Sequence, residues 1–182
     1  MNAPAAAKPK TAVVVMGVAG TGKSTVGQIL AGRLGWSFAE GDDFHSAANV
    51  AKMASGTPLT DEDRRPWLES IRTWIDANPG DSVVTCSALR RSYRDILRGA
   101  QANVRFLHLS GTEESISARM AARTSHFMPT SLLASQLATL EPLEADEDGV
   151  AIEIAGTPEE IVTRAIRALG LREVGAANPP IR

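Results

Sequence analysis

The chain has 182 residues with 19 Lys or Arg and 21 Asp or Glu, a formal charge of −2, and a hydrophobic content of 43%. This length suits a single globular domain, and so balanced a charge gives no electrostatic footprint for a nucleic-acid partner. No apolar run approaches the ~18 residues of a membrane span, and a single Cys cannot form an internal disulfide, which favours a cytoplasmic location.

Short apolar runs alternate with helical patterns along the chain. Residues 1–10 are expected to form a disordered tail, residues 11–172 a single domain, and residues 173–182 a flexible tail. In chain order we expect a strand at Thr11–Met16, a helix at Thr25–Leu34, a strand at Ser37–Ala39, a helix at Arg64–Ala77, a strand at Ser82–Cys86, a helix at Arg91–Arg98, a strand at Val104–Leu109, a helix from the N-cap Thr112 to Arg123, a strand at Ala151–Ile154 and a helix begun by the capping box of Thr157 and Glu160. This alternation predicts an α/β fold with a mainly parallel five-stranded sheet flanked by helices.

The segment after the first expected strand carries the strongest motif. It reads Gly17-Val18-Ala19-Gly20-Thr21-Gly22-Lys23-Ser24, which matches G-x-x-x-x-G-K-[ST], the phosphate-binding P-loop. Glycines let successive N–H groups point at phosphate oxygens, and the start of the next helix adds partial positive charge. Lys23 is expected to reach the β- and γ-phosphates of ATP, Ser24 to ligate Mg²⁺, and Thr25 to bind another phosphate.

A P-loop indicates phosphate binding but leaves the reaction open. The Asn-Lys-x-Asp segment with which switch proteins bind guanine is absent. The short chain and the five expected strands leave little room for a motor or a large ATPase. A small-molecule or nucleotide kinase remains as the expected class.

Several further segments form a joint pattern between about Thr11 and Leu169. They are Gly41-Asp42-Asp43-Phe44-His45, Asn49-x-x-Lys52-Met53, the run from Gly56 to Leu68, the run from Cys86 to Asp95, Arg119-x-x-x-Arg123-x-x-His126-Phe127-Met128-Pro129, and Ser135-Gln136. This pattern resembles the gluconokinases, although that family usually has Pro in place of Ser46 and often Lys in place of Arg90.

The resemblance implies a three-layer P-loop kinase fold like that of nucleoside-monophosphate kinases, with a small helical lid at about residues 119–140. It also implies phosphorylation of gluconate by ATP with Mg²⁺, often by a homodimer. The product, 6-phosphogluconate, would feed the pentose phosphate and Entner-Doudoroff routes.

Asp42 and two histidines are candidates for contact with the acceptor. Asp42 follows an expected strand, where a carboxylate could accept the proton of a substrate hydroxyl or help to hold Mg²⁺, and the alternative is a helix N-cap. His45 could hydrogen-bond gluconate, or it could be a structural residue. His126, in the expected lid, could contact the ligand or pack against the closed lid.

Arginines are the candidates for binding the anionic groups. Arg64 and Arg91 could bind the carboxylate of gluconate, because a guanidinium forms two parallel bonds with a carboxylate; the alternative is surface ion pairs with nearby Asp residues. The hydroxyl of Ser87 could bind substrate or a water on Mg²⁺. Arg119 and Arg123 are spaced i, i+4, so they are expected to share a helix face and to hold the triphosphate between them, unless that face is only solvated.

The adenine pocket, the alternative functions and the role of Cys86 complete the expectations from the sequence. The adenine pocket is expected at Arg119 and the loop Gly156-Thr157-Pro158, from resemblance and position. A shikimate or nucleoside-monophosphate kinase is an alternative enzyme, although shikimate kinases carry three glycines where this chain has Cys86-Ser87-Ala88. A nucleotide-binding regulator without catalysis is a third possibility. Cys86 is expected to be a small buried residue.

Overall fold

The computed structural model describes residues 8–123 and 130–176. Its elements are β1 (Thr11–Met16), α1 (Lys23–Leu34), β2 (Ser37–Ala39), the 3-10 turn η1 (Gly41–Phe44), α2 (Ala47–Ala54), α3 (Asp61–Ala77), β3 (Ser82–Thr85), α4 (Arg91–Arg98), β4 (Asn103–Ser110), α5 (Glu113–Ala121), α6 (Thr130–Thr139), β5 (Gly149–Glu153) and α7 (Pro158–Leu169). The strands form one fully parallel sheet in the order β2-β3-β1-β4-β5. The expected α/β fold with a five-stranded parallel sheet is confirmed.

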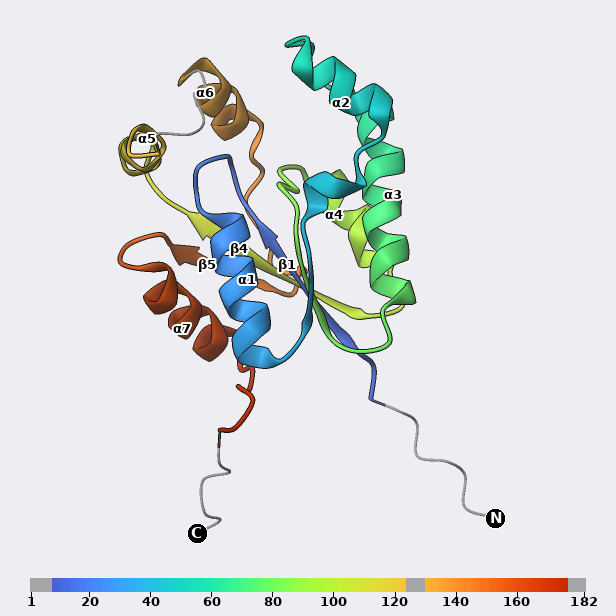
Figure 1. The fold of residues 1–182 in the computed structure, drawn as a ribbon, viewed down its shortest axis with the longest axis vertical. Coiled ribbons are helices and arrows are strands. Elements are labelled where there is room, and N and C mark those ends of the chain that lie inside the picture. Colours follow the sequence, from blue (N-terminus) through green and yellow to red (C-terminus); the bar gives the residue numbers. More distant parts are fainter. Residues whose placement is uncertain (1–7, 124–129, 177–182) are drawn as a thin grey trace.

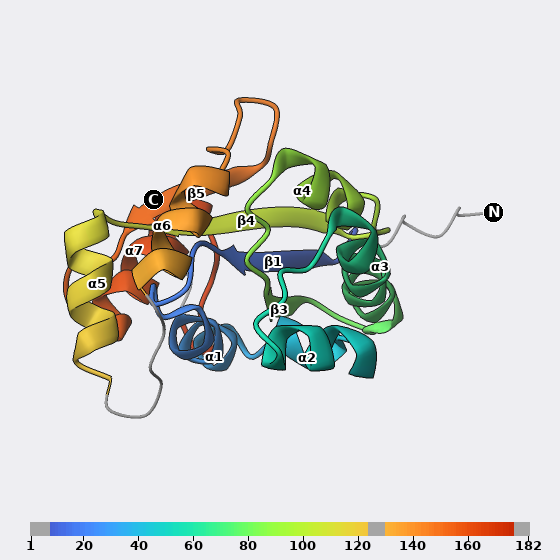
Figure 2. The same cartoon turned by 90° about the horizontal axis from the view of Figure 1, so that it is seen from above.

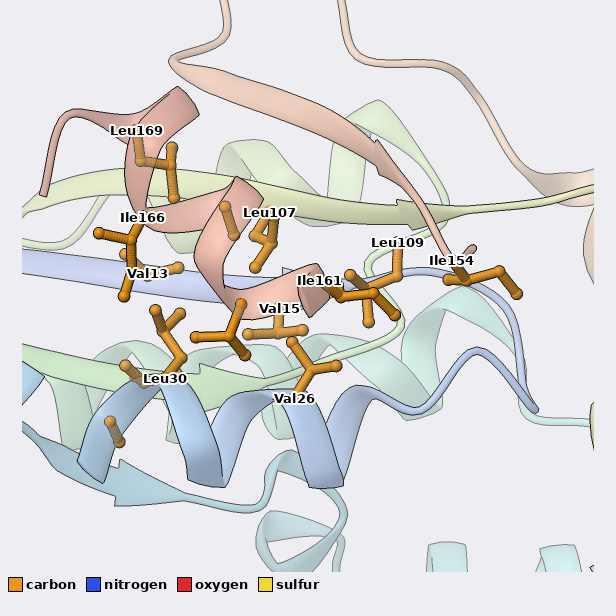
Figure 3. Close-up of a cluster of buried hydrophobic side chains, with 14 of the residues drawn as sticks. Val13, Val15, Val26, Leu30, Leu107, Leu109, Ile154, Ile161, Ile166 and Leu169 are labelled. Carbon is orange, nitrogen blue, oxygen red and sulfur yellow. The ribbon is translucent and has the colours of Figure 1, made fainter. Parts of the chain in front are cut away.

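The central strand β1 sends alternate side chains to the two faces of the sheet. Val13 and Val15 are fully buried against side chains of α1 and α7 on one face (Figure 3). Val14 is buried on the other face with Leu68 and Ile71 of α3, and Figure 1 shows helices on both sides of the sheet. Burial on both faces explains why β1 reads as a nearly continuous apolar run.

Two short elements, η1 and α2, are additional to the expected ones, whereas α6 falls within the range of the expected helical lid. In α2 only Asn49 is buried, and its eight residues are fewer than the ~11–18 over which helical periodicity is counted in a sequence. α3 begins three residues before the expected start because Thr60 and Asp63 form a capping box. The expected caps at Thr112 and Thr157 are present.

Both expected tails are held where they leave the domain. The Lys10 ammonium donates hydrogen bonds to two carbonyls at the end of α3, at 2.6 and 2.7 Å. At the other end, Arg33 Nε donates to Glu173 at 2.5 Å, and the backbone of Val174 donates to the carbonyl of Arg33 at 3.0 Å. Lys10, Glu173 and Val174, just outside residues 11–172, thus contact the domain. Residues 1–7 and 177–182 lie outside the described ranges, and the expected tails stay a prediction.

The parallel sheet places the carboxyl ends of its strands at one edge, where ligands bind in open α/β folds. The loop after β1, η1 after β2 and the segment after β3 all leave from this edge. In Figure 1, α2, α5 and α6 lie at this end of the molecule. Among the described residues, no helix is long and apolar enough to cross a membrane.

Candidate active site

The loop between β1 and α1 has the backbone shape that phosphate binding requires. Gly17, Gly20 and Gly22 have φ angles of 141°, 83° and 89°, which residues with a side chain rarely adopt. No side chain caps the start of α1, so the N–H groups of its first turn are available to an anion. Ser24 and Thr25 lie exposed in this turn. This geometry suits the triphosphate expected along residues 17–25.

Lys23 folds back over the loop, and its Nζ donates a hydrogen bond to the carbonyl of Val18 at 3.0 Å. Burial lowers the pKa of Lys23, while the negative charges of Asp42 and Glu40 counteract this effect and the positive charge of Arg123 adds to it. Asp42, Glu40 and Arg123 therefore all lie within electrostatic reach of the Lys23 ammonium, as a phosphoryl-transfer site needs.

η1 brings Asp42 to this loop because its first residue is tied to two neighbours. The backbone N–H of Gly41 donates to Thr85 Oγ1 at 3.0 Å, and Trp67 Nε1 donates to the carbonyl of Gly41 at 2.7 Å. The side chain of Asp42 is 85% exposed. Ser46, not Asp42, caps α2, so the carboxylate of Asp42 is available to a ligand.

The side chain of His45 is largely buried and contacts Trp67, Asn49 and Asp42. Its ring stacks on Trp67 with centroids 4.2 Å apart and planes at 15°. Its Nδ1 is 3.4 Å from the side-chain nitrogen of Asn49, and its Nε2 is 4.0 Å from Asp42 Oδ1. Burial lowers the pKa of His45, and nearby Arg64 lowers it further, against the opposing charge of Asp42. The neutral ring can therefore orient a hydroxyl and support η1 at the same time.

The segment after β3 lies against the P-loop. The carbonyl of Ser87 accepts a hydrogen bond from the backbone N–H of Gly17 at 3.2 Å, which places Ser87 beside the expected phosphate site. Cys86 is buried, and burial raises the pKa of its thiol to about 12. The expectation that Cys86 is a small buried residue is therefore confirmed.

Two arginines converge on the ring of Tyr93. The guanidinium carbons of Arg64 and Arg90 lie 5.6 and 5.9 Å from the ring centroid. Asp61 lies 4.0 Å from Arg64 and 3.5 Å from Arg90, and it accepts a hydrogen bond from Tyr93 at 2.5 Å. Arg64 also donates to the carbonyl of Leu59 at 2.6 Å. Two cations thus share one carboxylate, which leaves positive charge for an anionic substrate.

Arg91 has a different environment from the one expected. Its guanidinium is engaged by Asp95 at 2.9 Å, Glu144 at 2.9 Å and Asp146 at 2.7 Å. Four of the five N–H groups of Arg91 are directed at these carboxylates, which favours the ion-pair alternative. Binding of gluconate by Arg91 stays a prediction.

The helix expected to reach Arg123 is shorter, because α5 ends at Ala121. A contact of Arg119 and Arg123 with the triphosphate stays a prediction. Arg119 donates to the carbonyls of Ile154 and, at 3.2 Å, of Gly156, so it lies against the loop after β5 proposed for adenine. Arg123 is exposed and acts on the pKa of Lys23. His126 lies outside the described residues.

Sequence reasoning assigned no role to two polar residues at this site, Glu40 and Gln136, although Gln136 belongs to the Ser135-Gln136 segment of the resemblance. Glu40 accepts a hydrogen bond from the hydroxyl of Thr85 and influences Lys23; its position at a strand end, two residues before Asp42, was the available signal. Gln136 of α6 accepts a hydrogen bond from the backbone N–H of Ala19 at 2.7 Å. This contact joins residues 117 positions apart, which no local pattern predicts.

Comparison with known proteins identifies the relatives of this chain. The family model for shikimate kinase matches residues 19–169. A gluconokinase of Gluconobacter oxydans is 48% identical, with 85% of this chain and 89% of the relative aligned. Two solved structures share the fold. A sugar kinase from Janibacter is 51% identical, with 90% of this chain and 96% of that chain covered and a TM-score of 0.83. A gluconokinase from Sinorhizobium meliloti is 46% identical, with 89% of this chain and 92% of that chain covered and a TM-score of 0.82. The P-loop, the Asp42 segment and these similarities place the chain in one family: it belongs to the gluconokinases, enzymes of the P-loop kinase fold.

Proposed function

We propose that this chain transfers the γ-phosphoryl group of ATP to the primary hydroxyl of D-gluconate and releases 6-phospho-D-gluconate. One arrangement carries the proposal: the exposed carboxylate of Asp42 lies near enough to the P-loop for its charge to act on the ammonium of Lys23. A phosphate-binding cation beside an exposed carboxylate suits transfer to a hydroxyl. Membership of the gluconokinase family supports gluconate as the acceptor.

The nucleotide would lie along residues 17–25, with its phosphates at the N–H groups of the loop and of the first turn of α1. The exposed hydroxyl of Ser24 offers the hard oxygen ligand that Mg²⁺ prefers, and Mg²⁺, when bound, would neutralise phosphate charge. Lys23 would leave the carbonyl of Val18 for the phosphates, and Arg123, whose charge acts on Lys23, would add positive charge. Arg119, bound to the loop of Gly156, would contact the adenine.

The acceptor would lie between η1 and the two arginines on Tyr93. Arg64 would bind the carboxylate of gluconate, while His45 and Ser87 would hydrogen-bond its hydroxyls. Asp42 would hold the primary hydroxyl in line with the γ-phosphate and accept its proton as the new O–P bond forms. His126 stays a candidate from the resemblance.

A coupled assay of ATP consumption tests the reaction, with gluconate, shikimate, AMP or no acceptor present. We expect turnover with gluconate and only background with the others. A preference for shikimate or AMP would favour the alternative kinases, and ATP binding without any phosphorylated product would favour a non-catalytic regulator.

Two variants test the roles of Lys23 and Asp42. Lys23→Ala should lower kcat/KM by orders of magnitude while leaving the thermal melt intact, because it removes a charge that stabilises the transferring phosphoryl group. Asp42→Asn should lower kcat far more than ATP affinity. The adjacent and equally exposed Asp43 gives the matched control: Asp43→Asn should keep wild-type kcat.

The family resemblance also predicts a homodimer, and the single cysteine predicts a cytoplasmic location. Sedimentation at two protein concentrations would test the first, and fractionation of the native cells would test the second.

A further inference from the structure

One peptide bond of the P-loop, between Val18 and Ala19, is held at both of its polar ends. Its carbonyl accepts hydrogen bonds from Lys23 Nζ and from Thr21 Oγ1, each at 3.0 Å. Its N–H donates to the side-chain oxygen of Gln136 at 2.7 Å. Because a peptide unit is planar and rigid, fixing its N–H also fixes the direction of its carbonyl. Gln136 therefore determines where the carbonyl that holds Lys23 points.

Gln136 is itself well anchored. It lies on α6, where Leu133 is 1% exposed within the core and Leu137 packs against the same cluster. Figure 2 shows α6 beside the loop that follows β1. The next loop residue, Gly20, meets the other neighbouring helix: a Cβ at Gly20 would lie 2.4 Å from Met120 of α5. The two helices on either side of residues 124–129 thus contact adjacent residues of the P-loop.

We propose that Gln136 is a positioning residue for the P-loop. It holds the Val18–Ala19 peptide in one orientation and thereby keeps Lys23 and the following N–H groups arranged before the nucleotide arrives. A loop that is already ordered loses less conformational freedom on binding, so its ligand binds more tightly. The predicted effect is selective: losing this hydrogen bond should weaken the binding of ATP and leave the affinity for gluconate unchanged.

Gln136→Met is the decisive variant because Met keeps the length and helix propensity of Gln but cannot accept the hydrogen bond. We expect the dissociation constant for a non-hydrolysable ATP analogue, measured by calorimetry, to rise about 2- to 10-fold, as the net worth of one hydrogen bond implies. The KM for gluconate should stay at the wild-type value. Ser135→Ala changes the exposed neighbour on the same helix and should leave both values unchanged.

Hydrogen exchange separates positioning from general support of the fold. The amide of Ala19 should exchange faster in Gln136→Met, whereas Gln136→Glu, which keeps an acceptor, should retain the protection. Wild-type nucleotide affinity in Gln136→Met would overturn the proposal, and so would a lower Tm without a change in that affinity. The comparison of KM values for gluconate rests on the proposed function. The calorimetric titration with the ATP analogue needs no acceptor. It would therefore still test the role of Gln136 if gluconate were not the substrate.

Discussion

The buried ion pair between Arg94 and Glu147 should dominate the stability of the chain segment between α6 and β5. Both side chains are 0% exposed, and Arg94 donates to the two carboxylate oxygens of Glu147 at 2.5 and 3.0 Å. The remaining Arg94 donors reach the carbonyls of Ala88, Leu89, Glu141 and Pro142. One guanidinium therefore ties the segment after α6 to the segment after β3. Arg94→Met would leave a buried carboxylate and several carbonyls without donors.

Removing one partner of a buried pair costs about 3–5 kcal/mol of unfolding free energy. In a chain of this size, at ~2–4 °C per kcal/mol, that loss lowers the Tm by about 6–20 °C. Urea unfolding followed by tryptophan fluorescence would measure it. Arg98→Met, on the same helix, breaks an exposed pair with Asp95 and should cost less than about 1 kcal/mol.

The response to pH and to a second substitution tests the cause. Burial by itself would raise the pKa of Glu147, but the hydrogen bonds from Arg94 bring it below its ordinary value. Without Arg94 the folded pKa should rise above the unfolded one, so the destabilisation of Arg94→Met should shrink as the pH falls. Adding Glu147→Leu should recover much of the loss. A cost below about 1 kcal/mol, or no recovery in the double variant, would refute the reasoning.

Three further predictions concern single residues. Gly41→Ala should abolish most gluconate turnover, because the new Cβ would lie 1.9 Å from a carbonyl oxygen of β3. The control Gly32→Ala places its Cβ in open space on α1 and should raise the Tm. Equal gluconate turnover in the two variants would contradict this. Cys86 should resist alkylation in the native protein, because burial raises the pKa of its thiol to about 12, and it should react once urea unfolds the chain. Mass spectrometry measures alkylation in the native and the unfolded protein. Rapid alkylation of the native protein would count against this prediction. Burial lowers the pKa values of His45 and His108, so the unfolded state binds protons that the folded state does not, and the urea midpoint should fall as the pH drops below about 6.5. A midpoint that stays constant between pH 7.5 and 5.5 would exclude this linkage.

Features encoded within a few residues could be predicted from the sequence. The strand, glycine loop and helix around Lys23 follow one another directly, and the caps at Thr112 and Thr157 each depend on a residue three positions away. Features that depend on distant partners could not. Arg91 is taken up by Glu144 and Asp146, more than 50 positions later in the chain, so a pattern around residue 91 could not separate a substrate ligand from an ion pair.

The helix α2 shows a second limit of sequence patterns. Its side chains are mostly exposed, with Val50 at 51% and Met53 at 45%. The polar contacts of Asn49 with His45 and the carbonyl of Asp63 hold it. A helix of eight residues is shorter than the ~11–18 residues over which helical periodicity is counted, so a sequence pattern alone does not mark it.

The central place of β1 has a consequence for how the enzyme is made. Ala12 pairs with Ser82 and Thr11 with Asn103, so both neighbours of the P-loop strand are synthesised long after it. Contacts between such distant residues are slow to form, because a long loop of chain must close first. During synthesis, the buried valines of β1 must therefore wait until about residue 110 has emerged before the sheet can enclose them. The strand that positions the phosphate loop is made before both of its neighbours and can be enclosed only after them, so we expect the emerging chain to be most prone to aggregation in this interval.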